Sequence, residues 1–240
     1  SIAYPTDLAS GRCARGTFPV VIEHMPYVQF AVSVKVNPFF AEHGDISVQV
    51  RARGLGKSGG DMQFLSPREG LDGKAIIDWA AHRLDGSDGR VGLIGCSWPG
   101  AIAMTGAAAV GPDSPLKAAV AACSGMENMH RQSWLNAGLP TMSFWQFVER
   151  GAPLTGNSAA GQRYFKRFAD SVLSGGDMAY DADYWRDRGR ATLARRIVDN
   201  GVPMLLWAGW GDMVETGTVP WPWPLLARDE YLTPNRDYRF

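Results

Sequence analysis

The segment Val91-Gly-Leu-Ile-Gly95-Cys-Ser97-Trp-Pro-Gly100 decides the fold of this chain. A short apolar run, typical of a buried strand, ends at Gly95, and a run of small residues, typical of a closely packed helix, follows Gly100. A tight turn between a strand and a helix lifts the side chain of its serine clear of the backbone. The segment therefore predicts a nucleophilic hydroxyl at Ser97, and a serine that only caps the following helix is the structural alternative.

Composition and charge exclude several classes of protein. The 240 residues are 45% hydrophobic and 20% charged, which suits one domain or one core with an inserted subdomain. The 24 basic and 24 acidic side chains balance, so nothing favours nucleic acid or an anionic membrane as a partner. No apolar run reaches the roughly 18 residues of a transmembrane helix. The start, Ser1-Ile-Ala-Tyr-Pro5, shows no signal-peptide pattern, so we favour a cytoplasmic location although the sequence does not fix the compartment.

The three cysteines, Cys13, Cys96 and Cys123, are odd in number and have no ligand spacing. They argue against a disulfide framework and against a zinc site. We expect them to be small buried side chains, and we expect the protein to need no metal and no cofactor.

Strand and helix patterns alternate along much of the chain. Short apolar runs predict strands at 18–22, 46–50, 90–94, 116–123 and 203–208. Helical spacing predicts helices at 38–44, 71–84 and 101–110. This alternation predicts an α/β fold with a mostly parallel sheet and helices on both of its faces.

The stretch 124–202 differs from the rest because it is rich in aromatic residues and shows helical runs with no strand between them. We interpret it as an inserted helical cap, with 1–123 and 203–240 forming the α/β core. We expect four aromatic side chains to line an apolar substrate pocket: Trp134, Phe144, Trp145 and Trp210.

Two further residues follow predicted strand ends, where open α/β sheets place their active residues. Asp212 is the candidate triad acid, with a turn aspartate as the alternative, and its place after Ser97 matches the serine–acid–histidine order. The phenol of Tyr27 could donate to an oxyanion beside the backbone N–H of Trp98. An aromatic that covers the sheet edge is the alternative, and spacing alone favours that alternative.

The base is missing from its usual place. All four histidines, His24, His43, His82 and His130, precede Asp212. His24 and His130 are the two that could approach the cleft, and we expect His43 and His82 to be solvated. The string Gly54-Leu-Gly56-Lys57-Ser58 ends like a phosphate-binding loop, but position 51 is arginine where that motif requires glycine. A phosphate-binding protein based on Lys57 is therefore a weaker alternative.

Four strings occur in one order that resembles a known family: Pro19-Val-Val-Ile-Glu-His-Met-Pro-Tyr27, Arg53-Gly-Leu-Gly-Lys-Ser-Gly-Gly60, Gly95-Cys-Ser97-Trp-Pro-Gly100 and Gly209-Trp-Gly-Asp212. They resemble the cocaine esterase-like (CocE/NonD) and X-prolyl dipeptidyl-peptidase group of α/β-hydrolases. Asp183-Tyr-Trp-Arg186 also resembles the cap of that group, and the resemblance runs from about residue 17 to residue 215.

The resemblance implies an α/β-hydrolase fold with Ser97 as nucleophile, Asp212 as acid, and the Tyr27 hydroxyl with the Trp98 amide as oxyanion hole. It implies a metal-free acyl-enzyme mechanism on esters or amides. The chain departs from the pattern in carrying Trp98 for a usual tyrosine and Arg51 for a common aspartate.

The resemblance also implies parts that the 240 residues lack: a later strand with the base histidine, and a C-terminal β-domain. We therefore expect a chain that stops before the last core strands, with the histidine on a second polypeptide or on a missing C-terminal part. A carboxylesterase or acylase is the favoured activity. There are two alternatives, an X-prolyl aminopeptidase and a catalytically silent subunit. The aminopeptidase would need a carboxylate such as Glu149 or Asp177 to bind the substrate amine.

Overall fold

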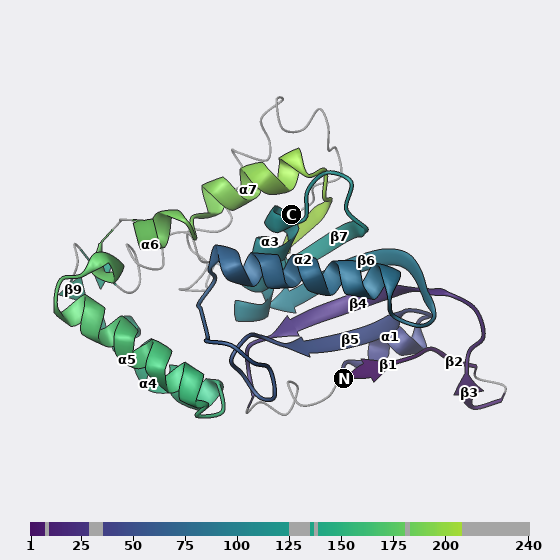
Figure 1. Ribbon diagram of the computed structural model, residues 1–240, viewed down its shortest axis with the longest axis horizontal. Coiled ribbons are helices and arrows are strands. Elements are labelled where there is room, and N and C mark those ends of the chain that lie inside the picture. Colours follow the sequence, from purple (N-terminus) through teal and green to yellow (C-terminus); the bar gives the residue numbers. More distant parts are fainter. Residues whose placement is uncertain (8–9, 29–35, 125–134, 137–138, 181–182, 208–240) are drawn as a thin grey trace.

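The computed structural model describes residues 1–7, 10–28, 36–124, 135–136, 139–180 and 183–207. Their main feature is a six-stranded sheet in the order β1–β5–β4–β6–β7–β10 (Figure 1). The strands are β1 (Ile2–Ala3), β4 (Phe18–Met25), β5 (Ile46–Arg51), β6 (Ser87–Cys96), β7 (Leu116–Ala122) and β10 (Met204–Trp207). Strand β1 pairs antiparallel with β5, and the other four pairings are parallel. The mostly parallel sheet expected from the alternation is confirmed.

Helices cover both faces of this sheet, but unequally. They are α1 (Pro38–Glu42), α2 (Pro67–His82), α3 (Trp98–Ala109) and α7 (Arg190–Asp199). Helices α2, α3 and α7 pack on one face, where Ile22 of β4 and Ile46 of β5 are fully buried. The short α1 lies on the other face, where Val21 and Glu23 of β4 point, because successive side chains of a strand alternate between faces.

Two of the observed helices, α2 and α3, begin earlier than the apolar periodicity predicts. Helix α2 starts at Pro67 instead of Leu71, because the Ser66 hydroxyl accepts the backbone N–H of Glu69 at 3.3 Å and caps the first turn. That turn carries no apolar stripe, so spacing alone could not detect it. Helix α3 likewise starts at Trp98 instead of Ala101.

The cap forms a group of helices beside the sheet (Figure 1). It comprises α4 (Met142–Leu154), α5 (Ala159–Leu173), η3 (Asp177–Ala179) and α6 (Asp183–Arg186). A second core, rich in aromatic side chains, joins these helices to the loop after β5 and to Trp98. The helical content expected here is present, but a small hairpin of β8 (Leu135–Asn136) and β9 (Leu139–Pro140) precedes α4, contrary to the expectation of no strand.

Helix α7 lies within the range that the sequence assigns to the cap, yet it packs against α3. Its side chains Leu193 and Ile197 join the core of the sheet. The other small element, a hairpin of β2 (Thr6–Asp7) and β3 (Arg12–Cys13), projects from the N-terminal side (Figure 1).

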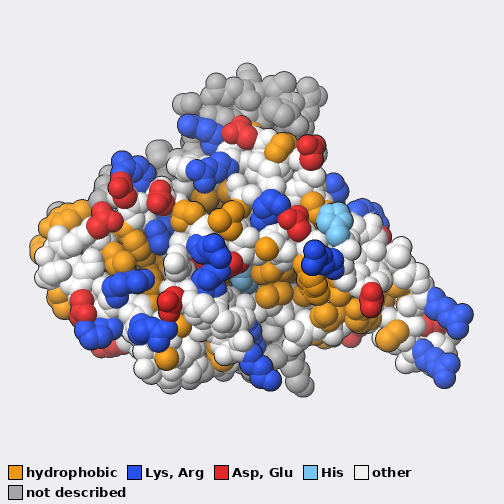
Figure 2. Space-filling model, in the orientation of Figure 1, with side chains coloured by type: hydrophobic (Ala, Val, Ile, Leu, Met, Phe, Trp, Pro, Cys, Tyr) orange, Lys and Arg blue, Asp and Glu red, His pale blue; other side chains and the backbone are white. Residues whose placement is uncertain are grey.

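Charged side chains of both signs are interspersed over the face shown in Figure 2. Within the part of the chain that the structure describes, no helix is long and apolar enough to cross a membrane. Two of the cysteines, Cys13 and Cys96, are exposed, and Cys123 is half-buried. The expectation that all three are buried is therefore wrong.

Candidate active site

The backbone at Ser97 is strained in the way that a nucleophile elbow requires. Ser97 connects β6 to α3 with φ 64° and ψ −128°, a conformation that side-chain-bearing residues rarely adopt. Its side chain makes no capping hydrogen bond to α3, so the alternative of a simple helix cap is contradicted. Strain of this kind persists where the surrounding structure holds the residue for a chemical role.

Two glycines make this turn possible. A Cβ atom on Gly95 would lie 2.3 Å from the carbonyl carbon of Pro99, and one on Gly100 would lie 2.8 Å from the carbonyl oxygen of Ala122. The backbone N–H of Ser97 donates to the same Ala122 oxygen at 2.8 Å and ties the turn to β7. The small residues in the motif therefore let strand and helix pass at contact distance.

Two hydrogen bonds in series link the Trp98 amide, the Tyr27 phenol and the serine oxygen. The Tyr27 hydroxyl donates to Ser97 Oγ at 3.2 Å, and the Trp98 backbone N–H donates to the Tyr27 hydroxyl oxygen at 3.3 Å. Burial is the main cause that raises the pKa of Tyr27, so the phenol keeps its proton at neutral pH. The structure thus brings together Tyr27, Ser97 and Trp98, the three residues that the family resemblance groups in one site.

Arg51 supports this arrangement from β5. Its Nη1 donates to the backbone carbonyl oxygen of Tyr27 at 2.5 Å. The sequence marks this position only as a departure from the pattern of the resembled family and assigns it no role in the site. Here the arginine fixes the loop that carries the phenol.

The aromatic wall behind the serine comes from a residue that sequence reasoning missed. Phe64, in the loop between β5 and α2, is 1% exposed, and its ring centroid lies 4.8 Å from that of Trp98. The expected pocket residue Phe144 is completely buried within the cap. Trp145 is half-buried, and the centroid of its ring lies 5.1 Å from that of Phe144. Trp134, Trp210 and the candidate acid Asp212 lie outside the described residues.

No described histidine hydrogen-bonds to Ser97. His24 is buried on β4 facing α2 and α3, His43 stacks on Phe39, and His82 ends α2 at the surface. His130 lies outside the described residues. Burial lowers the pKa of His24 to about 4, and its Nδ1 has no hydrogen-bond partner in the part of the chain that the structure describes.

The buried His24 makes stability depend on pH. The unfolded chain binds a proton at its pKa of 6.5, whereas the folded chain binds one only near 4, so stability falls as pH decreases between these values. We expect the wild type to lose about 2 kcal/mol more unfolding free energy than His24→Leu between pH 7 and about pH 5. Urea unfolding of both proteins at the two pH values measures this difference. Equal losses would show that His24 titrates normally in the folded state.

Glu69 does not disturb that comparison. Burial raises its pKa to about 8, so the folded state holds this proton more tightly than the unfolded state does and gains stability as pH falls from 8 towards 4.5. The gain is common to the wild type and to His24→Leu, and it cancels in the difference between them.

The loop that resembles a phosphate site is folded on itself. The Gly54 N–H donates to the Gly59 oxygen at 3.0 Å, and the Ser58 hydroxyl donates to the Arg51 oxygen at 3.0 Å. No helix follows Ser58 directly, because α2 begins at Pro67. The loop therefore lacks the helix N-terminus on which phosphate-binding loops depend.

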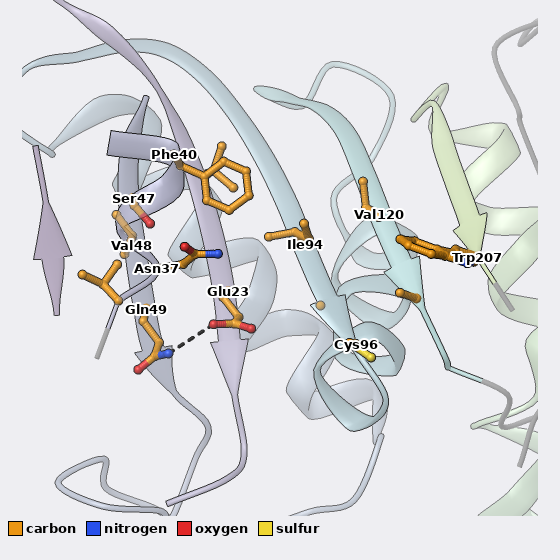
Figure 3. A pocket seen from close by; sticks show the side chains of 14 residues that line it. Glu23, Asn37, Phe40, Ser47, Val48, Gln49, Ile94, Cys96, Val120 and Trp207 are labelled. Atoms are coloured by element: carbon orange, nitrogen blue, oxygen red, sulfur yellow. Dashed lines mark hydrogen bonds between the residues drawn. The ribbon is translucent and has the colours of Figure 1, made fainter. Parts of the chain in front are cut away.

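An open trough occupies the opposite face of the sheet, between α1 and Trp207 (Figure 3). Its walls are mostly apolar, and its charged group is Glu23, whose pKa is raised chiefly by burial and which accepts a hydrogen bond from Gln49 at 3.1 Å. The exposed thiol of Cys96 lies at the end of the trough, beside Ser97 in sequence. Tyr27 and Trp98 do not line it, so it is separate from the serine site.

Solved structures of similar fold include an α-amino acid ester hydrolase (TM-score 0.67, 18% identity, 92% of this chain and 42% of that one). A CocE/NonD family hydrolase from Staphylococcus aureus has a TM-score of 0.62 at 21% identity, over 81% of this chain and 36% of that one. An aminopeptidase from a marine sediment archaeon, Thaumarchaeota archaeon, has a TM-score of 0.60 at 19% identity, over 88% of this chain and 41% of that one. The chain thus spans less than half the length of each. A comparison with curated proteins gave no match.

These similarities confirm the α/β-hydrolase fold. A family model described as X-Pro dipeptidyl-peptidase (S15 family) matches residues 4–229, which include Tyr27, the turn at Ser97 and the cap helices. The chain therefore belongs to the S15 peptidase family.

Proposed function

We propose that this chain is the nucleophile-bearing part of a serine hydrolase that cleaves ester or amide bonds through an acyl-enzyme on Ser97. The observation that carries the proposal is the strained Ser97 backbone, which sets the hydroxyl within hydrogen-bond distance of the Tyr27 phenol, itself bonded to the Trp98 amide. A serine that only capped α3 would need neither the strain nor the donors.

In the proposed mechanism, a histidine base removes the Ser97 proton as Oγ attacks the substrate carbonyl carbon. The carbonyl oxygen of the substrate then becomes an oxyanion. The Tyr27 phenol donates to this oxyanion instead of to Ser97 Oγ, and the Trp98 amide donates to it instead of to the Tyr27 oxygen. The bond to the leaving group then breaks, and the protonated histidine gives the leaving group its proton. Water hydrolyses the acyl-enzyme by the same steps in reverse, with Asp212 orienting the base.

We propose that this base lies outside residues 1–240, because no histidine follows His130 in the sequence and no described histidine reaches Ser97. A second polypeptide or a C-terminal part with a β-domain would supply it. The similar structures support this proposal, since the chain spans only 36–42% of their lengths.

The substrate class that we favour is an acyl ester or amide. The similar structures include an ester hydrolase and an aminopeptidase, so the comparisons support both bond types. An X-prolyl peptidase would need a carboxylate for the substrate amine. Glu149 is exposed on α4, and Asp177 already accepts the backbone N–H of Tyr184 at 3.0 Å, so neither is singled out for that role.

Fluorophosphonate labelling tests the proposal directly, because this probe reacts with an activated serine. We expect the purified protein to carry one adduct on Ser97 and to contain a polypeptide segment with the base histidine, both found by peptide mass mapping. A protein without adduct, with residues 1–240 as its only polypeptide, would favour the catalytically silent subunit.

A further inference from the structure

Arg188 lies where the chain leaves the cap and returns to the sheet. It follows α6 and precedes α7, whose buried side packs on α3. Its backbone N–H donates to the Trp185 oxygen at 3.0 Å, which ties this turn to α6. A side chain at this position can couple the cap to the core.

The guanidinium of Arg188 makes three contacts at once. Its Nε donates to the Phe64 backbone oxygen at 2.7 Å, and its Nη1 donates to the Tyr184 backbone oxygen at 2.6 Å. Its Cζ lies 3.7 Å from the centroid of the Tyr184 ring. A planar guanidinium combines stacking with donation in two directions, which a lysine ammonium does not. Arg188 therefore clamps the loop after β5 to α6.

Phe64 connects Arg188 to the serine site, because its backbone oxygen binds the guanidinium and its ring contacts Trp98. Its buried ring packs against the Trp98 ring at 68° with centroids 4.8 Å apart, and against Phe147 of α4 at 5.2 Å. A displacement of the Phe64 backbone therefore moves the surface on which Trp98 rests.

Among the described residues, it is the packing of neighbouring rings that holds Trp98. The buried Nε1 has no hydrogen-bond partner among the described residues. The rings of Phe64 and Tyr27 contact it edge-on, the latter with centroids 5.9 Å apart. Because the backbone N–H of Trp98 is an oxyanion donor, the packing of its ring also sets the position of that donor.

We propose that Arg188 is a positioning residue for catalysis at Ser97: by clamping Phe64 against Trp98 it fixes the geometry of the two oxyanion donors. The inference rests on the proposed function and adds to it a residue that touches neither the substrate nor Ser97. A misplacement on the order of 1 Å far from the reacting atoms is enough to slow catalysis strongly.

The test compares Arg188→Met with Arg186→Met in the full protein with its base. Arg186 is the matched control, since it lies on α6, is exposed, and pairs only with Asp183 among the described residues. With p-nitrophenyl acetate as substrate, we expect Arg188→Met to lower kcat about tenfold and to change KM less than about twofold. Arg186→Met should leave both unchanged.

A double-mutant cycle with Tyr27→Phe separates positioning from general damage. Both substitutions act on one oxyanion, so we expect the effect of Arg188→Met on kcat to shrink below about twofold in the Tyr27→Phe protein. Arg188→Lys keeps the charge but loses the planar guanidinium that donates in two directions. We expect it to lower kcat about threefold, and we expect this effect too to become smaller in the Tyr27→Phe protein. Arg188→Lys replaces Arg188→Met if that variant does not fold.

The positioning role would be overturned if the effects of Arg188→Met and Tyr27→Phe on kcat multiplied in full in the double variant. It would also be overturned if Arg186→Met lowered kcat as much as Arg188→Met does. The outcome is distinguishable from failure of the proposed function. Retained turnover in Ser97→Ala would reject that function, whereas lost turnover in Ser97→Ala with unchanged kcat in Arg188→Met would reject the role of Arg188 alone.

Discussion

Replacing Ser97 by alanine is expected to lower ester turnover by at least about 10⁴-fold, the scale seen when a triad nucleophile is removed. The loss should appear in kcat, because the hydroxyl forms the acyl bond and contributes little to binding the substrate. Stability should not fall, since the side chain of Ser97 does not cap α3 and its hydrogen bond is to the Tyr27 phenol. Steady-state kinetics and thermal unfolding of the same preparation measure both effects.

Cys96→Ala is the matched control for this substitution. Cys96 is an exposed thiol next to Ser97 in the elbow, and it points into the trough on the opposite face of the sheet (Figure 3). We expect Cys96→Ala to retain turnover within about twofold, because it removes no group from the proposed oxyanion site. Loss of activity in Cys96→Ala together with activity in Ser97→Ala would identify the thiol as the nucleophile and reject the proposed mechanism.

The parts of the site that local sequence predicted are those in which one short segment carries the whole signal. The apolar run before Gly95 and the small residues after it define a strand, a turn and a helix, and the structure has all three. Tyr27 could be placed because it follows a strand end, and parallel strands present these ends at one edge of a sheet.

The rest depends on contacts between distant segments. The hydrogen bond from Arg188 to the Phe64 oxygen joins residues 124 positions apart, and no periodicity records it. The sequence predicts that Phe144 lines a pocket, but its side chain is 0% exposed. An aromatic residue in a cap can pack inward or line a pocket, and the neighbouring helices decide which of the two occurs. Sequence gives the residue type in such cases, whereas the direction of the side chain comes from tertiary packing.

The second large effect is expected at Gly95, where the fold and the site depend on one missing side chain. A Cβ atom there would lie 2.3 Å from the Pro99 carbonyl carbon and 2.4 Å from its oxygen, which are backbone atoms that cannot rotate away. Gly95→Ala must therefore push α3 from β6. We expect it to lower the unfolding free energy by about 3 kcal/mol or more, as severe overpacking does. Urea unfolding measures this loss.

Gly92→Ala is the control on the same strand, since the one atom of the described residues that its Cβ would meet is the Ala118 oxygen, at an ordinary 3.9 Å. We expect a change within about 1 kcal/mol there, because β6 can hold a small side chain at that position. Similar losses in both variants would mean that β6 rejects any added methyl group. A large loss in Gly95→Ala alone would show that the turn at Ser97 depends on the close passage of strand and helix. Any Gly95→Ala protein that still folds should then show reduced labelling of Ser97, because the displaced helix carries the Trp98 donor with it.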